Sequence, residues 1–301
     1  MEFSETEVIT GDLISRFEKV VQRFPEKIAL KSPRSELTFL ELDNWSNGIA
    51  LKLLERQKPG DRVGLLFSHG VKSMVAQVAA LKGGFTRTEL NVSYPGARLR
   101  EIIQHCQIRC ILSRTEFRDL AEELASEQGI SILYVDEAEP SALQKPGVVL
   151  APRTPSSISF SSGSTGKPKL KEKNHLIELH SVMRVSQSIG LLPQDRMLFT
   201  RSATVIPFHA LLTGACYYPA DIQREGDLVD LVNWVRDEQI TILRSPVSIF
   251  RAMMHTIPEG ETLPSLSRIV LQGEPVYRAD VEAYRKRFNE QCVMVSTLGV
   301  S

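Results

Sequence analysis

Hydroxyl groups, glycines and lysines are concentrated in residues 161–169, which read Ser-Ser-Gly-Ser-Thr-Gly-Lys-Pro-Lys. Glycine lets the backbone turn its N–H groups inward as a nest that holds an anion. Lys167 and Lys169 add positive charge. Four hydroxyl side chains add neutral donors: Ser161, Ser162, Ser164 and Thr165. Together these groups can hold a polyphosphate, and we predict that this segment, the 161–169 loop, binds phosphate.

The spacing within the loop separates it from the best-known phosphate-binding motif. A Walker loop requires a glycine, four residues of any type and then Gly-Lys-Ser/Thr. Here Gly163 and Gly166 are three positions apart, and Lys167 is followed by Pro168. An unrelated P-loop NTPase is therefore disfavoured. The remaining structural alternative is a flexible Gly/Ser linker, which would not need two lysines and a proline at fixed places.

The elements that must position this loop follow an alternating pattern. Short apolar runs alternate with amphipathic helical patterns, which indicates an α/β fold with a mostly parallel sheet. Strands are expected near residues 27–31, 63–67, 109–113, 130–135, 197–200, 240–243, 268–272 and 292–295. Helices are expected over 11–24, 38–57, 71–82, 95–105, 117–128, 228–237, 246–255 and 277–288, with another after His175. Thr38 and Glu41 predict a capping box at the start of one helix.

A polar, proline-bearing segment at residues 136–155 divides this pattern. It predicts two packed α/β sub-domains, residues 1–155 and residues 156–301, with the 161–169 loop in the second. In open α/β sheets, ligands bind beyond the carboxyl ends of the strands. Two further loops occupy that position, Gly273-Glu274-Pro275 and residues 296–301. If the strands are parallel, all three loops meet at one cleft.

The bulk composition excludes several classes of function. The 301 residues are 42% apolar and 24% charged, and 36 basic residues balance 36 acidic ones, so no nucleic-acid partner is expected. The N-terminal residues do not resemble a signal peptide, and no apolar run approaches the ~20 residues that span a bilayer. Four cysteines without metal-site spacing are interpreted as buried free thiols. We therefore expect a cytoplasmic protein without a membrane partner.

The order of residues from Ser162 to Lys169 closely resembles the phosphate-binding signature of the adenylate-forming (AMP-binding) superfamily. This superfamily includes acyl-CoA synthetases, adenylation domains of non-ribosomal peptide synthetases, and luciferases. Further segments along almost the whole chain resemble the family: residues 37–42, 59–64, 81–84, 93–99, Asn174-His175 and Gly273-Glu274. The resemblance implies two packed sub-domains with mostly parallel sheets, the large N-terminal part of an adenylation core.

The resemblance stops at residue 301. Gly299 and Ser301 match a family segment whose next residue is a glutamate that contacts magnesium. The ribose-binding aspartate and the C-terminal domain with its catalytic lysine have no counterpart here. We therefore expect a truncated adenylation core that is inactive as an isolated ligase. Leu170 replaces a usual glycine, and Leu298 replaces the tyrosine that stacks on adenine. These departures keep open a nucleotide-binding but catalytically inert module.

The resemblance implies ATP-dependent activation of a carboxylic acid to an acyl-adenylate. Transfer to a thiol follows, from CoA or from the pantetheine arm of an acyl or peptidyl carrier protein. ATP and Mg²⁺ are the implied cofactors, and no residue is assigned as a metal ligand. Thr165 and Lys169 are assigned to catalysis. Nucleotide binding is assigned to the following residues: Ser161, Ser162, Gly163, Ser164, Thr165, Gly166, Lys167, Lys169, Gly273, Glu274, Gly299 and Ser301.

Two features of the sequence bear on the identity of the substrate: a missing acidic residue and a Phe-His pair. Family members that use α-amino acids carry an aspartate before the Gly-Ala segment, here Gly214-Ala215, but no acidic residue occurs between Asp195 and Asp221. An aryl, fatty or other simple acid is therefore favoured. Phe208 and His209 resemble a pair that lines the acyl pocket of acyl-CoA synthetases. For His209 a core histidine, and for Glu274 a solvated turn carboxylate, remain alternatives, and His175 is expected to be structural.

Overall fold

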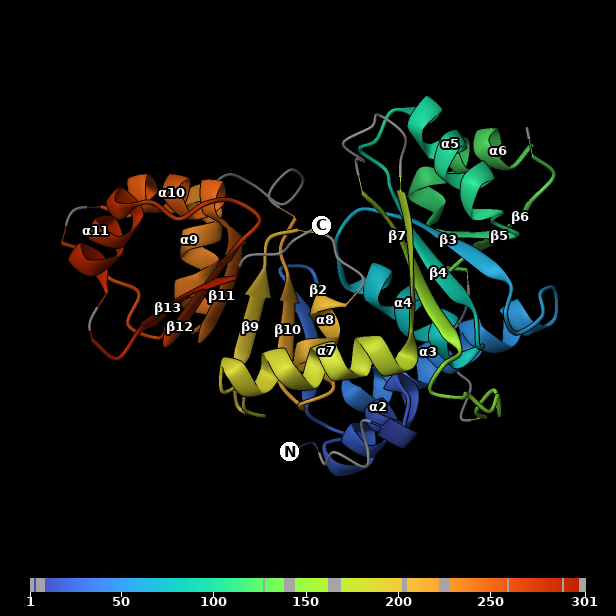
Figure 1. Cartoon of the computed structure of the whole chain (residues 1–301), viewed down its shortest axis with the longest axis horizontal. Coiled ribbons are helices and arrows are strands. Elements are labelled where there is room, and N and C mark those ends of the chain that lie inside the picture. The colour runs from blue at the N-terminus through green and yellow to red at the C-terminus, as the bar shows by residue number, and fades with distance from the viewer. Residues whose placement is uncertain are drawn as a thin grey trace.

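A computed structural model of the chain describes residues 3, 9–126, 128–137, 144–161, 169–201, 205–221, 228–258, 260–288 and 290–297. Within these residues the chain forms two sheets flanked by helices (Figure 1). The seven-stranded sheet has the order β13-β12-β11-β9-β10-β1-β2, and the six-stranded sheet has the order β6-β5-β3-β4-β7-β8. All described pairings are parallel except β1 with β2 and β7 with β8. The predicted α/β class with mostly parallel sheets is confirmed.

The six-stranded sheet contains most of the strands of the first half of the chain. Its strands are β3 (Arg62–Phe67), β4 (Thr86–Asn91), β5 (Cys110–Ser113), β6 (Ser131–Tyr134), β7 (Pro155–Ser161) and β8 (Lys169–Asn174). The helices between its strands are α4 (Val71–Lys82), α5 (Gly96–Cys106) and α6 (Arg118–Ser126), the last preceded by a short 3-10 turn at Thr115–Phe117. Helix α4 ends at Gly83, and Gly84 has a φ of 74°, a conformation that suits glycine.

The seven-stranded sheet contains most of the strands of the second half. Its strands are β1 (Ile28–Ser32), β2 (Ser35–Thr38), β9 (Arg196–Phe199), β10 (Cys216–Pro219), β11 (Ile242–Pro246), β12 (Arg268–Gln272) and β13 (Val293–Thr297). The associated helices are α7 (His175–Ser188), α8 (Ile206–Leu211), α9 (Leu228–Asp237), α10 (Val247–Thr256) and α11 (Arg278–Arg287). Two further helices precede the six-stranded sheet in the sequence: α2 (Leu13–Arg23) and α3 (Phe39–Leu54).

Each sheet takes strands from both halves of the sequence. Strands β1 and β2 lie in the seven-stranded sheet, whereas β7 and β8 lie in the six-stranded sheet. The two sub-domains were predicted to divide between residues 155 and 156. Neither sheet is therefore built only from strands on one side of that position. The division into residues 1–155 and 156–301 stays a prediction about domains.

One apolar core connects the two sheets. Its buried side chains come from helices α2, α3, α4 and α7 and from strands of both sheets, for example Phe17, Phe39, Val75, Leu179, Val63 and Tyr217. The predicted capping box is present at the start of α3. The Thr38 backbone N–H donates to Glu41 Oε2 at 2.7 Å, and the Glu41 backbone N–H donates to Thr38 Oγ1 at 3.1 Å. The four cysteines are buried and free, as predicted.

Candidate active site

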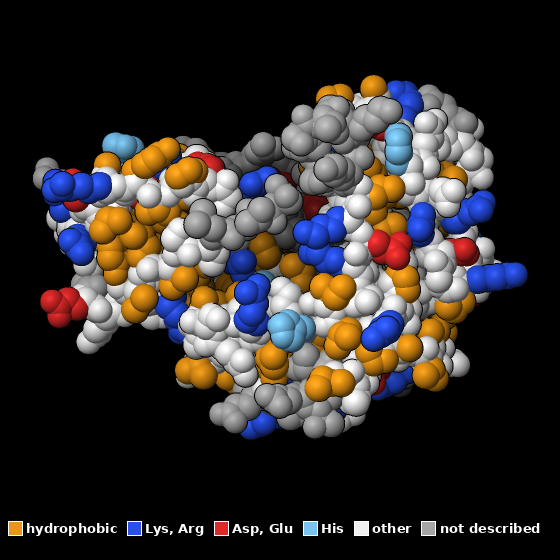
Figure 2. Space-filling model, in the orientation of Figure 1, with side chains coloured by type: hydrophobic (Ala, Val, Ile, Leu, Met, Phe, Trp, Pro, Cys, Tyr) orange, Lys and Arg blue, Asp and Glu red, His pale blue; other side chains and the backbone are white. Residues whose placement is uncertain are grey.

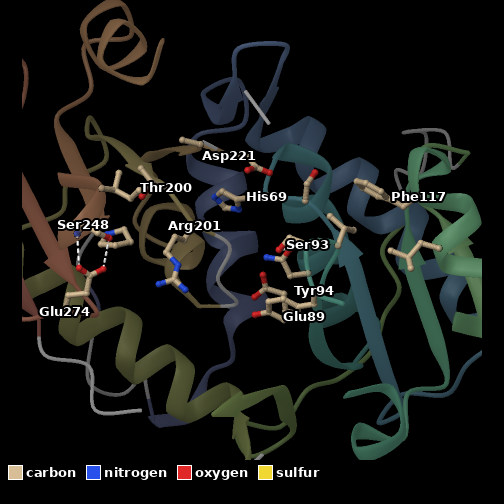
Figure 3. A pocket seen from close by; sticks show the side chains of 17 residues that line it. His69, Glu89, Ser93, Tyr94, Phe117, Thr200, Arg201, Asp221, Ser248 and Glu274 are labelled. Atoms are coloured by element: carbon tan, nitrogen blue, oxygen red, sulfur yellow. Dashed lines mark hydrogen bonds between the residues drawn. The ribbon is translucent and has the colours of Figure 1, made fainter. Parts of the chain in front are cut away.

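A cavity of about 760 Å³ lies at the carboxyl ends of parallel strands from both sheets (Figure 3). On the six-stranded side it is lined by the residues that follow β3 and β4. On the seven-stranded side it is lined by the residues that follow β9, β10, β11 and β12. Its polar lining residues are Ser68, His69, Glu89, Asn91, Ser93, Tyr94, Thr200, Arg201, Asp221, Ser248 and Glu274. A ligand site beyond strand ends is the location expected for open α/β sheets.

The molecular surface is hollowed between the two sheets. Figure 2 shows several Lys and Arg side chains along this hollow. Helix α7 runs beneath this hollow, from the six-stranded sheet toward the seven-stranded sheet (Figure 1). Strand ends of two sheets thus face one another across a single opening.

Glu274 contacts the start of a helix and also lines the cavity. Its carboxylate accepts from the Ser248 backbone N–H at 3.0 Å and from Ser248 Oγ at 2.7 Å (Figure 3). Ser248 lies in the first turn of α10, where unpaired backbone N–H groups favour a negative charge. Gly273, with a φ of 82°, allows the turn that brings Glu274 there from the end of β12. The predicted position of Gly273 and Glu274 at a strand end is confirmed, whereas their contact with nucleotide stays a prediction.

The three predicted loops follow strands β7, β12 and β13, and the structure describes all three strands. Strands β12 and β13 are parallel, with Gln272 opposite Thr297, so both end on the side of the cavity. Strand β7 runs parallel to β4 and ends at Ser161, and its antiparallel pairing with β8 sets Ser161 opposite Lys169. Two groups of predicted site residues lie outside the described residues: Ser162, Gly163, Ser164, Thr165, Gly166 and Lys167 in the 161–169 loop, and Gly299 and Ser301 in the loop at residues 296–301.

Phe208 and His209 are buried on the short helix α8 and are not among the residues that line the cavity. The guanidinium of Arg87 lies 4.8 Å from the centre of the Phe208 ring. His209 Nδ1 accepts from Arg244 Nη1 at 2.7 Å. Burial, and then the charge of Arg244, hold the pKa of His209 well below its usual range, so the imidazole is neutral. The structure therefore buries this pair outside the cavity lining, and direct contact with an acyl group stays a prediction.

His175 is the first residue of α7 and is fully buried. Its Nδ1 accepts from the Leu13 backbone N–H at 3.3 Å, which connects α7 to the start of α2. Burial lowers the pKa of His175 to about 4. The structural role predicted for His175 at a helix N-terminus agrees with these contacts.

Two buried ion pairs join elements around the six-stranded sheet. Arg87 on β4 contacts Glu178 on α7 at 2.9 Å, and both side chains are completely buried. Glu178 also accepts from Ser157 Oγ on β7 at 2.7 Å. Lys82 contacts Asp43 at 2.6 Å and Asn47 Oδ1 at 2.6 Å, which joins α4 to α3. We call Asp43, Lys82, Arg87 and Glu178 the paired cluster.

Apart from Glu274, the polar residues that line the cavity were not predicted as site residues from the sequence, and His69 and Arg201 are among them. Arg244, which contacts His209, was not predicted either. His69 follows β3, and its Nε2 lies 3.3 Å from the hydroxyl of Tyr217. Burial lowers the pKa of His69 to about 4, so it lines the cavity as a neutral imidazole. Arg201 follows β9, and Arg244 lies within β11. A search for polar residues directly after each predicted strand would have found His69 and Arg201.

The comparisons with known proteins agree with this architecture. The family model of AMP-binding enzymes matches residues 17–301, so this chain belongs to the AMP-binding enzyme family. Among curated relatives, surfactin synthase subunit 2 of Bacillus subtilis is 29% identical over 280 residues, which cover 86% of this chain and 8% of the relative. Nonribosomal peptide synthetase aneB of Aspergillus aculeatus is 30% identical over 280 residues, which cover 89% of this chain and 25% of the relative.

Solved structures share the fold. The nonribosomal peptide synthetase FmoA3 superposes with a TM-score of 0.87 and 22% identity, covering 97% of this chain and 33% of that chain. The N-terminal subdomain of Klebsiella oxytoca NpsA superposes with a TM-score of 0.81 and 21% identity, covering 99% of this chain and 74% of that chain. The chain thus spans at most a quarter of the two curated relatives named above. In the part of the chain that the structure describes, no helix is long and apolar enough to cross a membrane.

Proposed function

We propose that this chain supplies the acid- and nucleotide-binding part of an enzyme that activates a carboxylic acid with ATP. The observation that carries the proposal is the cavity formed where strand ends of the two sheets face each other, with Glu274 at its margin. Its volume, about 760 Å³, lies within the range of small-molecule sites. Family membership supports the same reaction class.

The proposed reaction requires positioning and charge neutralisation more than covalent help from the protein. A carboxylate oxygen attacks the α-phosphorus of ATP, pyrophosphate leaves, and an acyl-adenylate remains. The 161–169 loop is assigned to the β- and γ-phosphates through its hydroxyls and Lys169. Thr165 donates from its hydroxyl in this assignment, and Lys169 neutralises phosphate charge.

Magnesium would enter with the nucleotide. Among the described residues, no group of three or more His, Cys, Asp or Glu side chains is arranged to hold a metal ion. This fits a magnesium ion held largely by phosphate oxygens and water, with few protein carboxylates, which is the usual arrangement at ATP sites. ATP itself is consumed as a substrate.

For the acid, a compound without an α-ammonium group is favoured. Asp195 contacts Arg268 at 2.8 Å and accepts from Thr241 Oγ1, so its carboxylate is already engaged. Asp221 lines the cavity, but it also has a partner within the chain. A buried ammonium without a free carboxylate partner is costly. For the thiol acceptor we propose a carrier-protein pantetheine, because the curated relatives named above are peptide synthetases, with CoA as the alternative.

ATP–pyrophosphate exchange tests the adenylation step. The full-length protein is incubated with ATP, Mg²⁺, labelled pyrophosphate and one acid at a time from a panel of aryl, fatty, dicarboxylic and amino acids. We expect exchange with at least one acid and none in its absence. Measurable ATP binding without exchange for any acid would contradict the proposal and would favour the alternative, a nucleotide-binding but inert module.

The two lysines of the 161–169 loop provide a sharper test with a matched control. Lys169→Ala is expected to raise the KM for ATP on the order of 10-fold or more, since a charge-assisted contact to phosphate is removed. Lys167→Ala, two residues away, is the control and should have a much smaller effect. Equal effects of the two variants on ATP use would contradict the assignment of Lys169.

A further inference from the structure

Arg201 is a cation in the cavity lining that has no partner among the residues the structure describes. It directly follows the end of β9 and is exposed. In Figure 3 its side chain extends into the space between the Ser248–Glu274 contact on one side and Ser93, Tyr94 and Glu89 on the other. No hydrogen bond or ion pair connects the Arg201 side chain to any residue in the described ranges. The guanidinium carries five N–H donors, and none of them is used by a residue that the structure describes.

The other charged residues of the lining are accounted for. Glu274 is held at the start of α10 by two hydrogen bonds from Ser248. Glu89 and Asp221 each have a partner within the chain. His69 is neutral, because burial lowers its pKa to about 4. Among the described residues of the lining, Arg201 is therefore the charged residue that remains available to pair with a ligand.

A second arginine lies one step further along the same sheet and also lacks a carboxylate partner. Arg244 on β11 is buried, and burial lowers its pKa to about 10, so it is protonated near neutral pH. Its described partners are both uncharged: Gln272 Oε1 at 2.9 Å and His209 Nδ1 at 2.7 Å. Strand β11 pairs with β9, and Pro246 at its end lines the cavity. Two positive charges on adjacent strands thus act on the same side of the cavity.

We infer that the acid activated at this site carries a second carboxylate, which pairs with Arg201. The inference rests on the proposed function, because one carboxylate must remain free to react with ATP. The planar guanidinium binds a carboxylate through two parallel hydrogen bonds, which fixes direction as well as charge. The Thr200 hydroxyl also lines the cavity, whereas Ser248 Oγ already donates to Glu274 and Ser93 Oγ donates to Asn91. The substrate class is therefore a dicarboxylic acid.

Two rival roles for Arg201 make different predictions. Arg201 could contact the reacting carboxylate, or it could contact the phosphates of ATP. In both cases its removal would weaken the use of every acid by the same factor. A partner for a second carboxylate instead affects only acids that have one.

The experiment compares matched acids in the full-length protein. Succinate, glutarate and adipate are each paired with their own monoamide, which has nearly the same shape but lacks the second charge. KM is measured by ATP–pyrophosphate exchange, and Kd is measured by calorimetry in parallel. For at least one pair we expect the diacid to be preferred on the order of 10- to 100-fold, the range of a hydrogen-bonded charge pair.

Arg201→Gln should abolish this preference by weakening the diacid and leaving the monoamide nearly unchanged. Arg201→Lys should retain part of it, and Arg201→Glu should favour the corresponding ω-amino acid. Arg184→Gln on the exposed face of α7 removes the same charge outside the cavity and should change neither acid. Equal losses for diacid and monoamide, or no preference in the unaltered protein, would overturn the inference.

The calorimetric measurement separates this inference from the proposed function. Preferential binding of a diacid that depends on Arg201, without any exchange, would overturn adenylation and support the second-carboxylate site. Exchange with a monoacid alone, with no diacid preference in either measurement, would support adenylation and overturn the site.

Discussion

The two sheets differ in how their positively charged side chains are paired. On the six-stranded side, the paired cluster gives each cation a carboxylate: Arg87 has Glu178 and Lys82 has Asp43. On the seven-stranded side, Arg201 and Arg244, which we call the strand-end arginines, have no carboxylate partner among the described residues. Arg87, Arg201 and Arg244 all lie on or just after a parallel strand, yet only Arg87 has a carboxylate partner among the described residues. The difference indicates that one set of charges connects elements, whereas the other is left for a ligand.

The paired cluster connects elements that are far apart in sequence. Glu178 on α7 binds Arg87 on β4 and Ser157 on β7, so three elements are fixed by one carboxylate. Lys82 and Asp43 join α4 to α3. Because such charges are costly to bury alone, each depends on its partner.

The largest effect is expected from breaking the paired cluster. Glu178→Gln removes the carboxylate that pairs with the completely buried Arg87, and the free energy of unfolding should fall by about 3–5 kcal/mol. Urea denaturation measures the loss. The control is Glu172→Gln, whose exposed ion pair with Arg62 has an N–O distance of 3.4 Å. That change should cost about 1 kcal/mol or less. Similar losses in both variants would show that burial does not distinguish the two pairs.

The sequence predicted most helices and the apolar strands, because periodicity and caps are local. Helix α4 and strand β12 were predicted with the bounds that the structure shows, and the capping box of Thr38 and Glu41 was confirmed. Strands β4 and β8 were not predicted. Strand β4 reads Thr-Arg-Thr-Glu-Leu-Asn, and Arg87 is buried there only because Glu178 arrives from a distant helix. Strand β8 is a lysine-rich sheet edge, which suits charge but not an apolar pattern.

The sequence predicted part of the site, again where a local pattern was present. Gly273 and Glu274 were found because a glycine follows an apolar strand. Arg201 and His69 follow predicted strands, but a single charged or imidazole side chain there does not by itself indicate a ligand site. Only the three-dimensional structure shows that both face one cavity and that Arg201 lacks a partner there. The direct role predicted for Phe208 and His209 depended on family resemblance, and in the structure both are buried and neither is part of the cavity lining.

A smaller loss of stability is expected when the pH is lowered. It tests whether the surroundings of the paired cluster tolerate a positive charge on His175. His175 is buried close to Arg87 and Glu178, and its folded pKa is about 4, whereas the unfolded value is near 6.5. Between these values the unfolded chain binds a proton that the folded protein does not, so stability falls as pH falls. The loss over this window is up to about 3 kcal/mol.

His175→Gln removes this proton-binding difference. The variant should therefore lose less stability than the unaltered protein when urea denaturation is compared at pH 7 and pH 4.5. His180→Gln, on the exposed face of the same helix, is the matched control and should leave the pH dependence unchanged. An unchanged pH dependence in His175→Gln would mean that His175 is not held neutral by burial.

The smallest change in stability is expected from a strand-end arginine. Arg244→Met removes a buried charge that lacks a carboxylate partner, so the gain from avoided burial of charge offsets the lost hydrogen bonds to Gln272 and His209. The free energy of unfolding should stay within about 1 kcal/mol of the unaltered protein. Arg87→Met removes the same side chain on the paired side and should cost about 3–5 kcal/mol, because it strands the carboxylate of Glu178. Equal losses for the two arginines would show that Arg244 is a structural partner like Arg87, and the contrast between the two sides of the cavity would then not hold.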